Sequence, residues 1–472
     1  MMSPPRGVAG LRHRRVANVD IRPRPRRGPR RSTCLAALLA GLALAGCGDA
    51  PTAGADAGPG ADAGLDAAPG CPADHAGAAC VLALHDQAAA SCAPADLAAL
   101  RAELDARAGL GPLWAGGRAL FRTARPVQIA GGFNGWSTTA LASAALCGGG
   151  GGDGSDLVVA VGDVAAGHWP YKLFDGATWS LDVTNPAFAY DDFAGNADGE
   201  NSVLDTPGSG RGHLVHLPEA CSAALGTCRD VTAYLPADYT APEATSTTYP
   251  VVFMHDGQNV WDDHDCCFGH TGWELNVTLD AEIAAGRVAP AIVIAAASTA
   301  TRNDEYGLDL ATMATFMAFQ VEALQPAALA RVRWDGARVA IAGSSLGGLV
   351  SMYLALTYPQ TYRAAASLSG AFWPHQDTGE ALRDRLPALG KQPLALYVDH
   401  GGSVASNADG AADTVEVRDL LTGLGWVRGD SPACTAPTDS ALCYFSEPGA
   451  THDELAWKDR AWRFVRFLLP PP

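Results

Sequence analysis

The sequence predicts an α/β protein in which a mostly parallel central sheet follows a smaller N-terminal β-sandwich. Between residues 213 and 470, short apolar runs rich in Val, Ile and Ala alternate with longer stretches that favour helices. Such alternation builds parallel strands in a sheet that helices cover on both faces. Between residues 117 and 210, short β-type runs are separated by turn residues, which indicates a sandwich of antiparallel strands instead.

These changes of pattern divide the 472 residues into five parts. The expected parts, in chain order, are a signal peptide over 1–46, a flexible tether over 47–70, a short cysteine-containing helical segment over 71–116, the β-sandwich over 117–210 and the α/β domain over 211–472. The tether consists almost entirely of Ala, Gly, Asp and Pro, which cannot bury enough apolar surface to offset the entropy of ordering the chain.

The N-terminus has the features of an export signal. Residues 1–46 carry ten Arg and one Asp, and an apolar run extends from Leu35 to Gly46. This run is too short for a membrane-spanning helix but is typical of a signal peptide. It ends in Leu-Ala-Gly-Cys47, which resembles the bacterial lipobox, whose cysteine receives a diacylglycerol. We therefore expect an exported protein held at the cell envelope, on its periplasmic face or at the cell surface, by a lipid on Cys47.

Charge and cysteine content restrict the partners. The formal net charge of −17 argues against nucleic acid as a partner, because phosphate binding requires concentrated Lys and Arg. Apart from Cys34 and Cys47, ten cysteines remain, and an even number in an oxidising compartment suggests disulfides. Two pairs are close enough in sequence to close local loops, Cys221 with Cys228 and Cys434 with Cys443. Since no His cluster accompanies a Cys pair at zinc spacing, we expect no metal and no cofactor.

The predicted sandwich contains motifs of a known class of domain. Its Gly131-Gly-Phe-Asn-Gly-Trp136, Tyr171-Lys172, Trp179-Ser-Leu-Asp182 and Asn201-Ser-Val motifs resemble the glycogen-binding branch of the early-set immunoglobulin-like domains. The resemblance implies that a glucan is held by Trp136, Lys172, Trp179 and Asn201. Aromatic faces suit sugar rings, and amide and ammonium groups reach the hydroxyls. Related domains also serve as fixed spacers beside a catalytic domain, and the sequence leaves both roles open.

One strand of the α/β region runs into a nucleophile motif. The run Arg338-Val-Ala-Ile-Ala342 leads directly into Gly343-Ser-Ser345-Leu-Gly-Gly348, which matches the G-x-S-x-G elbow of α/β-hydrolases. Glycines flank the serine because a side chain there would collide with neighbouring backbone. The serine then lies at a helix N-terminus, where the helix dipole and free N–H groups favour an oxyanion. The motif predicts Ser345 as the nucleophile.

A serine nucleophile requires a base and an acid, which follow it along the chain in this fold. Of the three histidines after Ser345, His452 lies in a loop between the last apolar strand and a helix, where the fold delivers its base, whereas His375 and His400 fit pocket walls or the surface better. The candidates for the acid are Asp399, Asp409 and Asp413. Asp399 is still at a strand edge, so we expect Asp409, in the small-residue loop that follows, to orient His452.

The combined motifs carry a second resemblance. Together with the elbow and His452, the segments Asp256-Gly-Gln-Asn259, Gly272-Trp-Glu-Leu275 and Arg302-Asn-Asp-Glu-Tyr306 resemble the putative esterase family, which includes esterase D, enterochelin esterases, feruloyl esterases and mycolyltransferases. The resemblance covers about residues 225–470 and implies that the backbone N–H groups of Gln258 and Leu346 form an oxyanion hole. The adjacent Cys266 and Cys267 depart from the family pattern, and their pairing with each other or elsewhere is left open.

The family resemblance implies a serine esterase that works through an acyl-enzyme on a small-molecule or carbohydrate ester. An enterochelin esterase-like activity is the first expectation. A feruloyl or acetyl esterase acting on polysaccharide and an acyltransferase to a sugar acceptor are the alternatives, and a non-catalytic glycan-binding lipoprotein is the most distant one. The sequence does not indicate the oligomeric state.

Overall fold

The computed structural model describes residues 70–72, 74–148, 157–190, 199–241, 244–263, 266–267, 271–373, 382–430, 434 and 439–471. The predicted signal peptide, Cys47 and all of the tether except Gly70 lie outside these residues. Within the described ranges, no helix has both the length and the apolar character that a membrane crossing requires.

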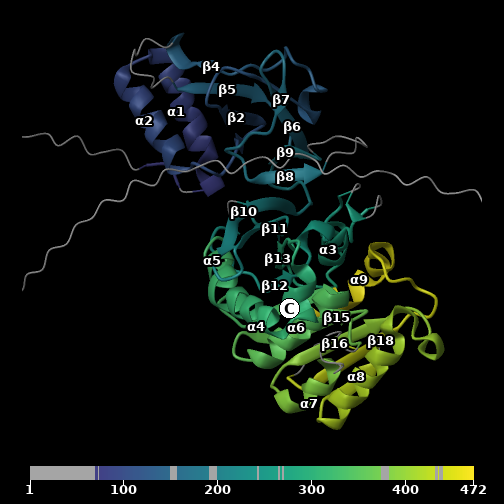
Figure 1. The fold of residues 1–472 in the computed structure, drawn as a ribbon. Coiled ribbons are helices and arrows are strands. Elements are labelled where there is room, and N and C mark those ends of the chain that lie inside the picture. The colour runs from purple at the N-terminus through teal and green to yellow at the C-terminus, as the bar shows by residue number, and fades with distance from the viewer. Residues whose placement is uncertain are drawn as a thin grey trace, which may run out of the picture. The chain divides into compact units, whose positions relative to one another are not determined.

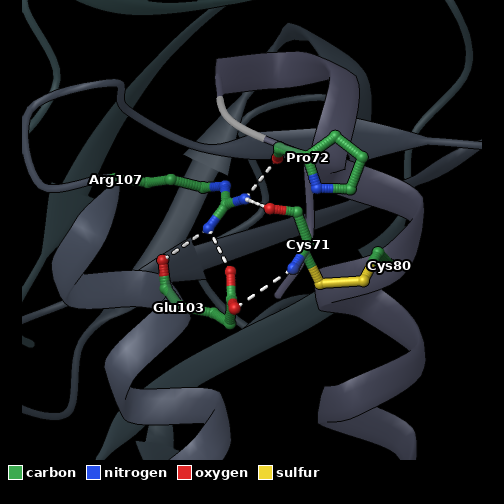
Figure 2. Close-up of a disulfide and its surroundings, with 5 residues drawn as sticks. All are labelled: Cys71, Pro72, Cys80, Glu103 and Arg107. Atoms are coloured by element: carbon green, nitrogen blue, oxygen red, sulfur yellow. Dashed lines mark hydrogen bonds and ion pairs between the residues drawn. A yellow bond between two sulfur atoms is a disulfide. The ribbon is translucent and has the colours of Figure 1, made fainter. Parts of the chain in front are cut away.

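The N-terminal described segment is a pair of helices fastened by disulfides. A short 3₁₀ turn at Asp74–Gly77 leads into α1 (Ala78–Ser91) and then α2 (Pro94–Ala106). Disulfides join Cys71 to Cys80 and Cys92 to Cys147. Figure 2 shows the buried Arg107 side chain reaching Glu103 of α2 and the carbonyl oxygens of Cys71 and Pro72. These bonds hold the start of the segment against the end of α2.

Two sheets with a shared core follow. One is antiparallel, with strand order β1-β2-β5-β4, and the other contains β3 and β6 to β9. Their common core includes Phe121 of β2 and Ala160 of β5 from the first sheet, and Ile129 of β3, Tyr171 of β6 and Leu204 of β9 from the second. The strands are β1 (Leu113–Ala115), β2 (Arg118–Arg122), β3 (Gln128–Gly131), β4 (Ala144–Ala145), β5 (Val158–Asp163), β6 (His168–Phe174), β7 (Trp179–Ser180), β8 (Ala187–Tyr190) and β9 (Glu200–Asp205). The early-set immunoglobulin-like assignment of this region stays a prediction.

The predicted α/β fold is confirmed. Among the described strands, β12, β13, β14, β15, β16, β17 and β18 pair in parallel in the order β17-β18-β16-β15-β14-β12-β13, and the antiparallel β11 and β10 extend this sheet into β8. The strands are β10 (His213–Ser222), β11 (Thr227–Leu235), β12 (Val251–Met254), β13 (Ile292–Ala296), β14 (Val339–Ser344), β15 (Tyr362–Leu368), β16 (Ala395–His400), β17 (Val427–Asp430) and β18 (Ala441–Ser446).

Helices cover both faces of this sheet because the strand side chains alternate between two apolar clusters. Phe253 and Ile341 belong to one cluster, together with side chains of α4, α6, α7 and α8. Met254 and Ala340 belong to the other, together with α3 and α9, which Figure 1 shows side by side. The helices are α3 (Leu275–Ala284), α4 (Leu310–Phe319), α5 (Gln325–Leu329), α6 (Ser345–Thr357), α7 (Leu386–Leu389), α8 (Ala411–Gly423) and α9 (Glu454–Leu468).

Candidate active site

Ser345 lies at a sharp turn between β14 and α6. It is the first residue of α6 and has a φ of 54°, in the left-handed region that a serine rarely adopts. A Cβ atom at Gly343 would lie 2.7 Å from the backbone carbon of Gly347, so no side chain fits at that position. The turn therefore holds the serine at the carboxyl end of β14 and at the N-terminus of a helix, as the motif predicts.

The structure brings Ser345, His452 and Asp409 together in one hydrogen-bonded chain. Nε2 of His452 lies 2.9 Å from Oγ of Ser345, and Nδ1 lies 2.5 Å from Oδ1 of Asp409. His452 belongs to the loop between β18 and α9, and its side chain is 35% exposed, so its ring is open to solvent while its acid partner is 2% exposed. The Trp457 ring packs edge-on against the imidazole at 5.1 Å.

Asp409 is held ionised by its surroundings. Its Oδ2 accepts hydrogen bonds from the Ser369 hydroxyl at 2.6 Å and from the Gly401 N–H. Burial by itself raises the pKa of Asp409, but hydrogen bonds from His452, Ser369 and Gly401 outweigh it and leave that pKa below its usual value. A charged carboxylate at this position fixes the imidazole with Nε2 free to accept the serine proton.

The other candidates for acid and base are engaged elsewhere. Asp399 is fully buried and accepts hydrogen bonds from Arg460 and Tyr397. Asp413 pairs with Arg383, and the His400 ring bonds the Tyr444 hydroxyl. His375 lies outside the described residues.

The loop that carries Gln258 lies against the start of α6, which carries Leu346. A Cβ atom on Gly347 would lie 3.0 Å from Oδ2 of Asp256 and 3.3 Å from Cβ of His255. Asp256 is clamped by Arg302, with N···O distances of 2.6 Å and 2.7 Å. The Gln258 side chain donates to the Ser298 hydroxyl at 2.9 Å and accepts from the Ser298 N–H at 3.0 Å. Both positions named for the oxyanion hole thus belong to segments in direct contact.

A buried ion pair supports the segment that clamps this loop. Glu305 is fully buried, pairs with Arg229 of β11 at 2.5 Å and accepts from the Thr301 hydroxyl at 2.9 Å. Next to the clamp, His255 packs against the rings of Tyr306 and Phe316. Burial lowers the pKa of His255 to about 4, so it stays neutral and acts as a packing residue.

The residues that support Asp409 were not predicted from the sequence. The Ser369 hydroxyl binds Asp409, and it also accepts from Nε1 of Trp457 at 3.0 Å and from Arg460 at 2.5 Å. One signal could have indicated Arg460: it is an arginine on the face of α9 that otherwise presents Trp457, Ala461 and Phe464 to the core. A charge on a buried helix face requires a partner.

The proposed glycan residues of the sandwich separate into two kinds. Trp136 and Trp179 are 41% and 43% exposed, and their ring centroids are 6.3 Å apart. Lys172 and Asn201 are only 8% and 5% exposed. The structure therefore brings the two tryptophans together on the surface but buries the two polar residues.

Cysteines form local links. Cys221 is joined to Cys228 across β10 and β11, Cys434 to Cys443, and Cys266 to its neighbour Cys267. In the part of the chain that the structure describes, the one group of potential metal ligands is Glu219 with Cys221 and Cys228. Since both sulfurs of that group are in a disulfide, they offer no thiolate to a metal.

Part of the chain matches the model of a known protein family. Residues 222–412 match the family described as "Putative esterase". Residues 222–412 are therefore similar to this family. A stretch of 127 residues is 35% identical to the iron(III) enterobactin esterase of Dickeya dadantii (strain 3937) and covers 26% of this chain. The aligned part of the chain spans 26% of the length of that relative.

Solved structures of esterases are also similar. A ferulic acid esterase is 17% identical, with 55% of this chain and 98% of that chain covered and a TM-score of 0.42. The enterobactin esterase of Shigella flexneri is 16% identical, with 76% and 96% covered and a TM-score of 0.40.

The contact between the Gln258 loop and α6 can be tested by adding one methyl group. Gly347→Ala should lower the free energy of unfolding by about 1–3 kcal/mol, because the new Cβ meets Asp256 and His255. The matched control is Gly423→Ala in α8, where nothing lies within 4 Å of the added Cβ, and it should stabilise the protein by about 0.5 kcal/mol. Urea unfolding measures both, and an equal response of the two variants would contradict the contact.

Proposed function

We propose that the protein is an exported serine carboxylic-ester hydrolase that acts through an acyl-enzyme on Ser345. The observation that carries the proposal is the chain of short contacts from Ser345 through His452 to Asp409, at 2.9 Å and 2.5 Å, on a strained strand-to-helix turn. This is the arrangement by which a neutral imidazole activates a hydroxyl for attack on a carbonyl carbon.

The reaction proceeds in two halves. His452 takes the proton of the Ser345 hydroxyl as its oxygen attacks the ester carbonyl, and the N–H groups of Gln258 and Leu346 stabilise the oxyanion. Asp409 stabilises the imidazolium, which then protonates the departing alcohol. Water, deprotonated by the same imidazole, releases the acid from Ser345.

For the substrate we propose an enterochelin-type ester. The 35% identity with an iron(III) enterobactin esterase over 127 residues supports this choice. Trp373 is 37% exposed and lies two residues after Ala371, whose N–H donates to the Ser345 carbonyl oxygen at 3.0 Å, so an exposed tryptophan is close in sequence to a residue that contacts the nucleophile. Trp261 and Trp273 are 1% and 3% exposed and serve the core instead.

Hydrolysis of feruloyl or acetyl esters on polysaccharide and acyl transfer to a sugar are the competing activities. Comparing kcat/KM for ferric enterobactin, methyl ferulate and acetylated xylan, with and without a sugar acceptor, separates them. The highest value for the enterobactin ester is the expected result.

Removal of the nucleophile tests the mechanism. Ser345→Ala should lower kcat for an aryl ester by about 10⁴-fold or more, because no acyl-enzyme can form. Ser246→Ala, at an exposed serine, is the control and should leave the rate unchanged. Hydrolysis of p-nitrophenyl acetate measures both, and substantial activity in a folded Ser345→Ala protein would refute the proposal.

A second proposal concerns the sandwich, where the exposed pair of Trp136 and Trp179 favours glycan binding. Phe174 lies beside Trp179, with ring centroids 4.8 Å apart, so three aromatic rings adjoin one another at this surface. Clustered aromatic faces suit the C–H faces of sugar rings. The burial of Lys172 and Asn201 restricts the contact to the aromatic residues.

Glycan binding predicts that Trp179→Ala reduces the affinity for a soluble glucan by about tenfold, through loss of ring stacking. Val183→Ala, which removes part of a 94% exposed side chain of the same sandwich, should have no effect. Affinity electrophoresis in gels containing glycogen compares them. Equal migration of wild type and Trp179→Ala would favour the spacer role.

For the location we propose export and anchoring at the cell envelope by a lipid on Cys47. The Arg-rich start, the apolar run and the lipobox-like Leu-Ala-Gly-Cys47 support it. In bacteria fed labelled palmitate, the full-length protein should incorporate label and sediment with membranes, because acyl chains give it membrane affinity. Cys47→Ser should abolish both, and label retained in that variant would contradict lipidation at this residue.

A further inference from the structure

The acid Asp409 accepts a hydrogen bond from the buried hydroxyl of Ser369, and that hydroxyl uses all of its hydrogen-bonding positions. Ser369 follows β15, has a φ of 47° and is fully buried. Its hydroxyl donates to Asp409 at 2.6 Å and accepts from Trp457 at 3.0 Å and from Arg460 at 2.5 Å. A hydroxyl has one proton and two lone pairs, so Ser369 can make these three bonds only with its proton directed at Asp409.

Arg460 of α9 lies between two carboxylates. Its Nε donates to Oδ2 of Asp399 at 3.1 Å, and its Nη2 lies 3.7 Å from Oδ2 of Asp409. The side chains of Arg460, Asp399 and Asp409 are 1%, 0% and 2% exposed. Asp399 also accepts from the Ser369 N–H at 3.1 Å and from the Tyr397 hydroxyl at 2.9 Å.

These contacts form a buried cluster of charged groups, and its net charge depends on whether His452 is protonated. Burial alone would lower the pKa of Arg460, but Asp399 and then Asp409 outweigh it, so that pKa lies above its usual value and the guanidinium stays charged. Arg460 and Asp399 neutralise each other, which leaves the charge of Asp409 available to His452. The cluster is therefore negative when the imidazole is neutral and becomes neutral when the imidazolium forms.

We propose that Asp399 and Arg460 are positioning residues: as a mutually neutralised pair they hold Asp409 through Ser369 and leave the negative charge of Asp409 available to His452, the base. This inference rests on the proposed esterase function. Neither residue touches the reacting atoms, and both act through Asp409.

Most of the other charged or titratable groups around the cluster have partners of their own. Glu454 accepts from Asn259 and Asp453 caps α9, while His400 bonds Tyr444, Asp413 pairs with Arg383, and Arg463 stacks over Phe445. One carboxylate oxygen of Glu447, in the loop between β18 and α9, is buried without a hydrogen-bond partner. All of these groups stay unchanged in the variants below, so they cannot produce shifts of opposite sign.

Two charge-removing variants test the inference through the acidic limb of kcat/KM against pH, which reports ionisation of the base in the free enzyme. Asp399→Asn leaves Arg460 unneutralised, which disfavours the imidazolium and should move the limb to lower pH by about half to one unit. Arg460→Gln removes the positive charge and should move the limb to higher pH by a similar amount. The double variant should return the limb near the wild-type position, since both charges are gone.

A purely structural role gives a different result. Variants that only loosen the site would lose kcat while the limb stays in place or moves in one direction for both, and either outcome overturns the inference. Arg460→Lys keeps the charge but loses the fork geometry, so it should lower kcat and leave the limb unmoved. If the acidic limb of kcat/KM shifts as far in Arg460→Lys as in Arg460→Gln, the inference is overturned. This comparison still applies if the Asp399→Asn variant does not fold.

The matched controls remove charges from an ion pair between the same helix, α9, and its neighbour α3. Arg466 pairs with Glu282 of α3 at 2.6 Å, six residues beyond Arg460 and therefore roughly 9 Å further along the helix axis. Arg466→Gln and Glu282→Gln should leave the limb in place, because solvent and salt screen charges at that separation. Residual turnover in Ser345→Ala would instead refute the esterase mechanism itself, so the two failures are distinguishable.

Discussion

The left-handed backbone at Ser345 is the constraint on which the rest of the site depends. A serine at a φ of 54° stays there only because its surroundings hold it. Gly343 lies too close to Gly347 for a side chain, and Gly347 leaves room for Asp256 and His255 of the neighbouring loop. The same turn therefore exposes the hydroxyl, starts α6 and brings the Gln258 loop against the helix N-terminus.

The remaining site residues come from segments that this sheet brings together. Parallel strands present their carboxyl ends at one edge, so the loops after β12, β14, β15, β16 and β18 supply Gln258, Ser345, Ser369, Asp409 and His452, respectively. The last helix, α9, then returns under the sheet and places Trp457 and Arg460 behind the acid. The loops at the edge of the sheet and one buried face of α9 thus together hold the site residues in position.

Much of the candidate site could be predicted from the sequence, because local sequence patterns indicate its residues. The elbow motif located Ser345 at the strand-to-helix turn, and loop position indicated Asp409 and His452, which the structure brings together. Strand β15 was missed: its Tyr-Arg-Ala-Ala-Ala-Ser-Leu has weak β character, and long-range pairing with β14 and β16 makes it a strand. Sequence also could not foresee that β10 and β11 extend the α/β sheet to β8, or that Lys172 and Asn201 are buried, since both depend on tertiary contacts.

The most direct test of the central claim is to find where an activated-serine reagent attaches. A fluorophosphonate reacts with a serine whose proton is taken by an adjacent base. Mass spectrometry of the digested, labelled protein should find the phosphonyl group on the peptide that contains Ser345, with labelling lost in His452→Ala. Labelling of another residue, or none in folded protein, would contradict the account.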